Sequence, residues 1–330
     1  MSTLRPVRNK GCQCGLSLPG LMIAMALSLL LSLGMVRIYL DNRRLETLAG
    51  ELALVQDSAR LASMLLRREI RMAGLFAGAS GTEGLAPVGI GGDCAERDWA
   101  LDTGWPLDLV DDFDGELLSR AGVRWTCLEA ASVVPGSDIL ALKRSAGQPT
   151  LIDGRFAAGV SRAEATQWYL RVAARGAAPG WFYSPRGGRF PAADRVIDSG
   201  VEYWEFYARI FYLRSYAVEP GDAIPTLCVE QLSGNRMATD CLVEGVEDMQ
   251  VEVGVDTDGD GVADRFLSAP GRGELSAARV LRVYLLLRGS QRLGGHRDNR
   301  RYRLGGKLTD PRGDAYHRRV TMLTVWLRNL

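Results

Sequence analysis

The 330-residue chain has few of the residues and motifs from which enzyme active sites are built. It contains two histidines, His296 and His317, and both lie among basic residues. It has no G-x-S-x-G, H-E-x-x-H or P-loop motif, and the glycines at 89, 91 and 92 precede a cysteine rather than a helical pattern. No Ser, His and Asp order favours a catalytic triad. The sequence therefore argues against an enzyme.

The chain also lacks a bias toward charge of one sign, and it lacks internal repeats and Pro/Ser-rich linkers. Its net charge is +1, and without the three basic residues of its first fifteen positions it has 37 basic against 39 acidic residues. This balance argues against nonspecific affinity for nucleic acid. The composition, 47% hydrophobic and 24% charged, is that of a globular chain. We expect an anchor followed by one or two soluble domains.

Long uncharged runs are absent except for one, Leu16 to Val36, with the sequence LSLPGLMIAMALSLLLSLGMV. Twenty-one residues at about 1.5 Å each cross the ~30 Å core of a bilayer. Basic residues precede this run, and the helical spacing continues after it to about Ala73, with Gly50 as the only turn signal. We therefore predict one long helix whose first half, 16–36, is transmembrane.

The second half of this helix, 37–76, is predicted to be amphipathic, with one apolar stripe on a globular domain. A homodimeric coiled coil is the alternative over so few heptads. The stripe is spaced by three and four residues and consists of Leu45, Leu48, Leu52, Val55, Ala59, Ala62 and Leu66.

The first residues of this helix resemble a class III prepilin signal, the start of type IV pilins and pseudopilins. The resemblance implies that a prepilin peptidase cuts after Gly15 and methylates Leu16, so that 1–15 is a leader. The family usually has Glu at the fifth mature position, where this chain has Gly20, as in the pseudopilin that caps the tip. The alternatives are a secretory signal, which has a shorter apolar core and an A-x-A-like site, and a plain anchor.

Two further regions resemble the PilW family of minor pilins. They are QDSARLASMLLRREIRMAGLFAG at 56–78 and a C-terminal part from about 240, with VEGVEDMQ, GVDTDGDG and RRVTMLTVWLRN. The resemblance implies an α+β pilin fold, in which the long helix packs on an antiparallel sheet of a β-rich domain, 77–330. It implies a non-catalytic minor pilin that primes or caps the type IV pilus near the tip.

The same resemblance implies the partners and the location. The partners would be other minor pilins, the major pilin, the prepilin peptidase and the inner-membrane assembly platform. The chain would sit in the bacterial inner membrane with a cytoplasmic N-terminus, and on the pilus after assembly. Two alternatives stay open, a J-like pseudopilin of type II secretion and a membrane-anchored calcium-dependent adhesin or DNA-uptake receptor.

Cysteines outside the leader number four, and an even number in an exported domain predicts two disulfides with three connectivities. Sequence proximity favours Cys94–Cys127 and Cys228–Cys241. The alternative is four free or metal-bound thiols, but no C-x-x-C pair supports a zinc site.

The strand patterns are expected to follow an irregular segment at 77–135. A helical turn is expected at 243–248, before a strand at 249–255, and a long polar loop at 289–316. The other predicted strands are 133–145, 167–172, 180–183, 278–287 and 318–327. The region 201–218 is predicted to form either two antiparallel strands or one long strand.

An acidic loop, D-T-D-G-D-G-V-A-D, begins at residue 256. Asp256, Asp258, Asp260 and Asp264 have the spacing of EF-hand positions 1, 3, 5 and 9, and Val262 could offer its carbonyl. The Glu of position 12 is replaced by Leu267. The loop therefore predicts either a Ca²⁺ site without its bidentate ligand or an Asp/Gly hairpin turn.

A basic segment, 288–319, has ten basic residues and three acidic ones. It could contact DNA phosphates or an acidic subunit. A solvated loop is the favoured interpretation, because aromatic stacking partners are few there.

Overall fold

The computed structural model describes residues 17–330 apart from 78–84, 96–97, 174–177 and 311. The predicted leader, with Gly15 and Leu16 at its cleavage site, lies outside the described residues. The chain divides into two compact units after Gly50. The first unit contains the apolar half of helix α1, and the second contains the rest of the chain.

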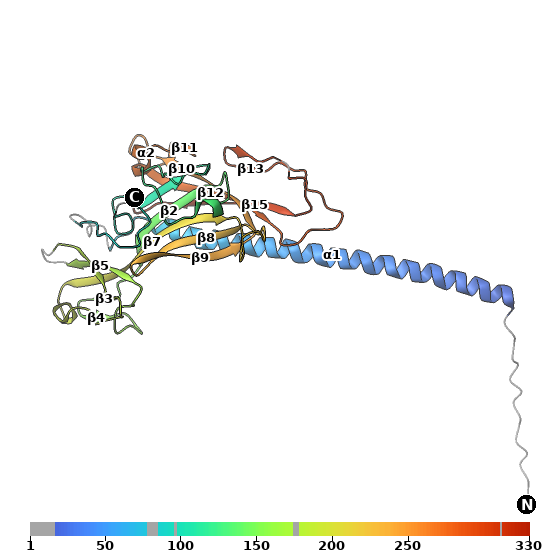
Figure 1. The fold of residues 1–330 in the computed structure, drawn as a ribbon, viewed down its shortest axis with the longest axis horizontal. Coiled ribbons are helices and arrows are strands. Elements are labelled where there is room, and N and C mark those ends of the chain that lie inside the picture. Colours follow the sequence, from blue (N-terminus) through green and yellow to red (C-terminus); the bar gives the residue numbers. More distant parts are fainter. Residues whose placement is uncertain (1–16, 78–84, 96–97, 174–177, 311) are drawn as a thin grey trace, which may run out of the picture. The chain divides into compact units, whose positions relative to one another are not determined.

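Helix α1 is continuous from Leu18 to Met72 (Figure 1). The prediction of one long helix is confirmed, and the helix ends four residues before the predicted boundary at 76. Gly74 follows in a left-handed conformation, with φ of +77°. A Cβ at this glycine would lie 2.5 Å from the side chain of Leu330, so the close approach of the C-terminus also requires glycine.

A large antiparallel sheet is organised around β7, a 14-residue strand that pairs with β2, β3, β5 and β8. The predicted region 201–218 is therefore one long strand that ends at Arg214, four residues before the predicted boundary. The nine strands are β1 (Leu107–Val110), β2 (Ile139–Ser145), β3 (Leu151–Ile152), β4 (Arg155–Phe156), β5 (Trp168–Ala173), β6 (Gly180–Tyr183), β7 (Val201–Arg214), β8 (Thr226–Ser233) and β9 (Arg236–Glu244).

A second antiparallel sheet, here called the C-terminal sheet, has the order β11-β10-β12-β15. The helical turn predicted at 243–248 is wrong, because β9 continues to Glu244 and β10 starts at Val246. Gly245, with φ of +80°, makes the tight connection, and Val246 already pairs with Leu287. The strands are β10 (Val246–Val255), β11 (Arg265–Leu267), β12 (Ala278–Arg288) and β15 (Arg318–Trp326).

Short elements complete the fold. The predicted loop 289–316 contains a small hairpin, which the sequence analysis did not expect. Strand β1 likewise lies in the segment 77–135 that was predicted to be irregular. The short elements are η1 (Ala130–Ser132), η2 (Ala192–Arg195), α2 (Arg272–Ser276), β13 (Arg303–Leu304) and β14 (Lys307–Leu308).

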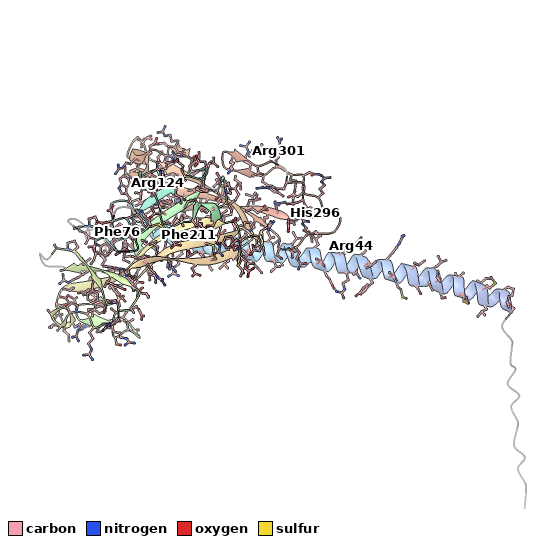
Figure 2. The ribbon with its side chains drawn as sticks, viewed as in Figure 1. Arg44, Phe76, Arg124, Phe211, His296 and Arg301 are labelled. Atoms are coloured by element: carbon pink, nitrogen blue, oxygen red, sulfur yellow. A yellow bond between two sulfur atoms is a disulfide. The ribbon has the colours of Figure 1, made fainter. Side chains whose placement is uncertain are left out.

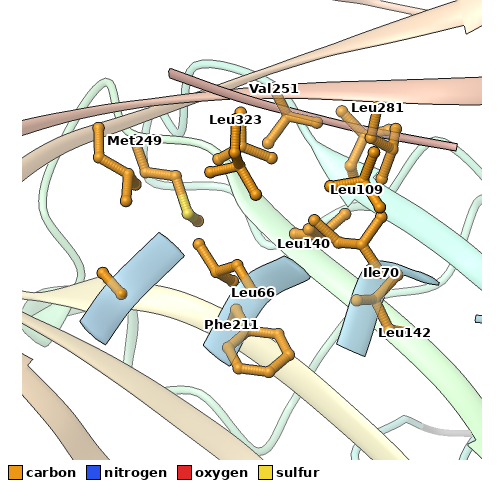
Figure 3. Packing of buried hydrophobic residues seen from close by; sticks show 14 of the residues in the cluster. Leu66, Ile70, Leu109, Leu140, Leu142, Phe211, Met249, Val251, Leu281 and Leu323 are labelled. Atoms are coloured by element: carbon orange, nitrogen blue, oxygen red, sulfur yellow. The ribbon is translucent and has the colours of Figure 1, made fainter. Parts of the chain in front are cut away.

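The main core lies between α1 and the two sheets (Figure 3). Leu66 and Ile70 of the helix pack with Phe211 of the large sheet and with Met249 of the C-terminal sheet. Burial of such side chains contributes about 1.5–3 kcal/mol each. The α+β fold, a long helix packed on antiparallel sheet, is confirmed.

A second core lies on the opposite face of the large sheet, and β2 belongs to both. Leu140 and Leu142 face the helix side, whereas Ile139 and Ala141 face the second core, as the alternation of a strand requires. All seven residues of β2 are buried. This strand is therefore the layer that separates the two cores.

The two disulfides are the ones that sequence proximity favours. Cys94 is bonded to Cys127, and Cys228 is bonded to Cys241. The second pair joins directly opposed residues of β8 and β9. The Cys94–Cys127 bridge closes the loop-rich segment that packs against the second core.

Candidate functional site

The apolar half of α1 is the first candidate. Within the described residues, α1 is the one helix that is long and apolar enough to cross a membrane. Its large side chains from Leu18 to Leu40 are exposed. The hydroxyls of Ser28 and Ser32 donate to the carbonyls of Met25 and Ser28, at 2.9 and 2.8 Å, so that these polar groups are satisfied within the helix. Such a surface suits a lipid or a helical neighbour.

The part of α1 that belongs to the second unit, from Glu51 on, packs one face in the core of that unit. Val55, Ala59, Ala62 and Leu66 of the predicted stripe are buried. The stripe begins later than predicted, because Leu45 is exposed. Before the boundary between the two units the helix has an exposed apolar part, and after it the helix buries one mostly apolar face.

A buried ion pair, which the sequence analysis missed, joins this helix to the large sheet. Both oxygens of Glu69 accept hydrogen bonds from Arg144, each at 2.8 Å, and Arg209 lies 2.7 Å away. Burial raises the pKa of Glu69, but the hydrogen bond from Arg144 and the charge of Arg209 outweigh it, so the pKa is below its ordinary value. The sequence signal for this ion pair was a carboxylate next to Ile70, within the apolar face of the helix.

The acidic loop brings three of its predicted ligands together. Carboxylate oxygens of Asp256, Asp258 and Asp260 lie within 4.8 Å of one another. Asp256 is buried, while Asp258 and Asp260 are exposed. Three oxygens are fewer than the six to eight that a Ca²⁺ ion takes.

The remaining contacts of the loop satisfy its carboxylates without a cation. Asp256 accepts hydrogen bonds from the amides of Gly259 and Gly261, and its carboxylate lies 3.3 Å from Arg279 Nε. Asp264 turns away from the group and accepts from the amide and hydroxyl of Thr257. These contacts build the hairpin turn and compete with a bound cation. Val262 is exposed, and its amide donates to Asp260.

The basic segment 288–319 uses part of its charge inside the fold. Arg318 is buried and donates to Glu247, Asp298 and Asp314. These carboxylates hold the pKa of Arg318 above its ordinary value despite burial. Arg300 also pairs with Asp298. The charges that remain exposed include Arg301, which Figure 2 labels. Arg318 therefore serves to fasten this segment rather than to bind a ligand.

Comparison with known proteins gives one match. Residues 210–329 match the family model described as Type IV Pilus-assembly protein W. No curated protein and no solved structure matches the chain. The matched part runs from the second half of β7 through the C-terminal sheet, and it includes the C-terminal motifs of the predicted resemblance. The match supports a protein of type IV pilus assembly.

Proposed function

We propose that this chain is a minor pilin that primes or caps a type IV pilus, with a role in packing rather than in catalysis. The observation that carries the proposal is the division of α1. Its first half exposes an uncharged and mostly apolar surface, and its second half packs in the core of a domain whose C-terminal part matches the pilus-assembly family. A pilin needs both properties, because the same helix serves as membrane anchor and as filament core.

The proposed assembly step is helix–helix packing in the inner membrane. Ala24, Ala26, Ser28 and Gly34 are small residues along the apolar half, which allow close approach of a neighbouring helix. An added Cβ at Gly34 would meet no atom within 4 Å, so this position presents open backbone. The neighbours would be other minor pilins and the major pilin, supplied by the assembly platform.

The mature N-terminus tests the proposal directly. We would express the full chain with and without a prepilin peptidase and measure its intact mass. Loss of residues 1–15 and gain of one methyl group on Leu16, only with the peptidase, is the expected result. A Gly15→Arg variant is the matched control and should stay uncut. A chain that keeps Met1, or that is cut after residue 36, would exclude the pilin route.

The place near the tip rests on Gly20, where the carboxylate that pairs with a neighbour's N-terminal amine is missing. A Gly20→Glu variant should still prime pilus formation and should also enter the shaft, which is measured by its amount in sheared pili. The glycine lies in the first turn of α1, and an added Cβ would lie 3.2 Å from the Ser17 hydroxyl, so the Ser17 side chain must shift by a few tenths of an ångström. Failure of this variant to assemble at all would contradict the tip position.

A J-like pseudopilin of type II secretion is the alternative within the same superfamily. Its helix would have the same properties, and the family match favours the pilus. Deletion of the gene distinguishes the two, since loss of surface pili with normal protein secretion is expected. Loss of secretion with intact pili would assign the chain to the secretion system.

Calcium binding at the acidic loop is a second proposal, favoured by the three clustered carboxylates. Such a site would make the chain a calcium-dependent adhesin or DNA-uptake receptor. Titration calorimetry of the full chain with Ca²⁺ should give saturable heat that an Asp258→Ala/Asp260→Ala variant loses. Asp240→Ala, at an exposed aspartate of β9, is the control. Absence of heat in the unaltered chain would remove calcium from the proposal.

A further inference from the structure

A cavity of about 440 Å³ lies on the second core, outside the elements used by the proposed function. Two tryptophans, two aspartates and two arginines contribute to its lining: Asp98, Trp99, Asp102, Trp105, Arg124 and Arg272. Its volume is in the range of small-molecule sites, which combine apolar surface with a few polar groups. Arg124, at its rim, is labelled in Figure 2.

The wall of this cavity is fixed by a buried lysine. Lys143 of β2 is almost completely buried, and its ammonium donates to the carbonyl oxygens of Trp99 and Asp102, at 2.5 and 2.7 Å. The same ammonium lies 4.4 Å from the centre of the Trp99 ring. Burying this charge lowers the pKa of Lys143 to about 8. The fold thus retains a costly charge directly behind the cavity wall.

Further contacts hold the same wall. The carboxylate of Asp93 accepts hydrogen bonds from the amides of Cys94 and Ala100, at 2.6 and 3.1 Å. Cys94 is joined to Cys127, just after Arg124. Trp99 and Trp125 pack edge to face behind the wall, with ring centres 6.3 Å apart. Walls held in this way position binding groups before a ligand arrives.

Three charged groups lie exposed at the opening, among the residues that the structure describes. Asp98, Arg124 and Arg272 are exposed, and none of them forms an ion pair with another residue that the structure describes. Arg272 lies over the ring of Trp105, 4.6 Å from its centre, and so links two sides of the cavity. The Asp102 carboxylate accepts only from the Gly104 amide, two residues away in the chain, among the described contacts.

The kinds of polar group restrict the ligand. An ionised carboxylate only accepts hydrogen bonds and a guanidinium only donates them, whereas a hydroxyl does both. A ligand rich in hydroxyls therefore pairs with both kinds, and a ligand of one strong charge is repelled by one of them. Indole faces add an apolar surface with a polar edge, on which the C–H face of a sugar ring can pack.

We propose that this cavity binds a neutral carbohydrate ring, such as one unit of a glycan, with Trp105 as packing surface and Asp98, Asp102, Arg124 and Arg272 as hydrogen-bonding groups. The pilin proposal is not required for this inference. Most of the lining lies before residue 210, outside the part that matches the family model, so the site is a property of this chain rather than of the matched scaffold.

Saturation-transfer NMR of the full chain tests the proposal. The chain would be held in a detergent without a sugar headgroup, and the probes would be single hexoses and N-acetylhexosamines at millimolar concentration. At least one sugar should receive saturation from the protein. An excess of the same sugar should then compete for the site and lower the fraction that is saturated. A Trp105→Ala variant should weaken its binding about tenfold or more, which corresponds to the loss of one stacked aromatic contact.

Two further variants make the result specific. Asp102→Asn keeps an oxygen for the Gly104 amide but removes the charge, and it should weaken the same probe without loss of the folded circular dichroism spectrum. Trp326→Ala removes an exposed tryptophan of β15 and should leave binding unchanged. The proposal is overturned if no sugar receives saturation, if the Trp105 variant binds as well as the unaltered chain, or if glutamine, a zwitterionic probe, binds in place of sugars.

Discussion

The C-terminal sheet buries aliphatic side chains, whereas the segment around the cavity lined by Trp99 and Trp105 buries charges. Val251, Val253, Leu281 and Leu285 are fully buried in the sheet, and they contact α1 or its neighbours in the main core. Around the cavity, Asp108 and Lys143 are buried and Asp93 is half-buried. Backbone groups pair with Lys143, with Asp93 and with one oxygen of Asp108, whose other oxygen has no partner among the described residues. The first region gains stability from area removed from water, and the second gains a fixed shape at an electrostatic cost.

Strand β2 shows why both solutions exist in one sheet. Arg144 points to the helix side and pairs with Glu69, whereas Lys143 points to the cavity side. Neighbouring residues of one strand thus serve different layers. We therefore predict that substitutions on the helix side alter the stability of the domain. Substitutions on the cavity side should alter how that stability depends on pH, and should alter ligand binding at the cavity.

The largest effect is expected from Glu69, one of two buried carboxylates on α1. A Glu69→Leu variant leaves Arg144 buried without its carboxylate and should lower the free energy of unfolding by about 4 kcal/mol. Denaturant unfolding followed by near-UV circular dichroism measures it. Adding Arg144→Met should recover most of the loss. If the double variant is no more stable than the single one, the pair is not the source of the effect.

Aliphatic burial on the helix is the next test. Leu66→Ala removes a side chain that is 0% exposed and should destabilise the domain by about 3 kcal/mol, through lost burial and a cavity. Met64→Ala, on the exposed side of the same helix, is the control and should change stability by less than about 0.5 kcal/mol. Equal effects of the two substitutions would mean that this face of α1 does not carry the core.

Lys143 provides the test on the cavity side. Its pKa, about 8 in the folded chain against 10.5 in model compounds, means that the unfolded chain binds its proton more tightly between these values. Stability from this group therefore rises as pH increases from 8 to 10.5. The difference in unfolding free energy between the unaltered chain and Lys143→Met should shift by up to about 3 kcal/mol in favour of the unaltered chain. Parallel pH profiles for the two proteins would contradict the buried charge.

The smallest contrast is expected between the disulfides. The Cys94–Cys127 bridge closes 33 residues and the Cys228–Cys241 bridge closes 13, so the loop-entropy model makes the first more stabilising by about 1 kcal/mol. Replacing each pair by alanines and comparing unfolding free energies measures this. Only the first replacement should also weaken binding at the cavity, because its bridge holds the wall. A larger loss for the second pair would show that β8–β9 pairing depends on its bridge.

Much of the fold could be predicted, but the contents of the sites could not. The apolar run and the stripe predicted α1, and alternation predicted β12 and β15 to within one residue at their ends. The error at 243–248 arose because a short valine-containing segment fits a helical turn as well as a strand. The segment forms a strand because Val246 pairs with Leu287, 41 residues away in the chain.

In the acidic loop, too, the sequence predicted part of the site and the tertiary structure decided the rest. Its spacing predicted that Asp256, Asp258 and Asp260 lie together, and they do. The partners that compete for those carboxylates, Arg279 above all, belong to the neighbouring strand β12 and depend on the register of the sheet. Sequence spacing alone contains no information about that register.

The sequence by itself determined where the chain is apolar throughout, where it is apolar on one side, and which cysteines are near enough to pair. These properties are local, since hydrophobic period and loop length act over a few turns or one hairpin. Only the tertiary structure decided that Glu69 meets Arg144 and that Trp105 meets Arg272. Such pairs join residues far apart in the chain, and the packing of the folded chain, not local spacing, decides which side chains meet. Glu69 is buried with Arg144 and Arg209, whereas the contact between Trp105 and Arg272 lies at the surface, with Arg272 exposed.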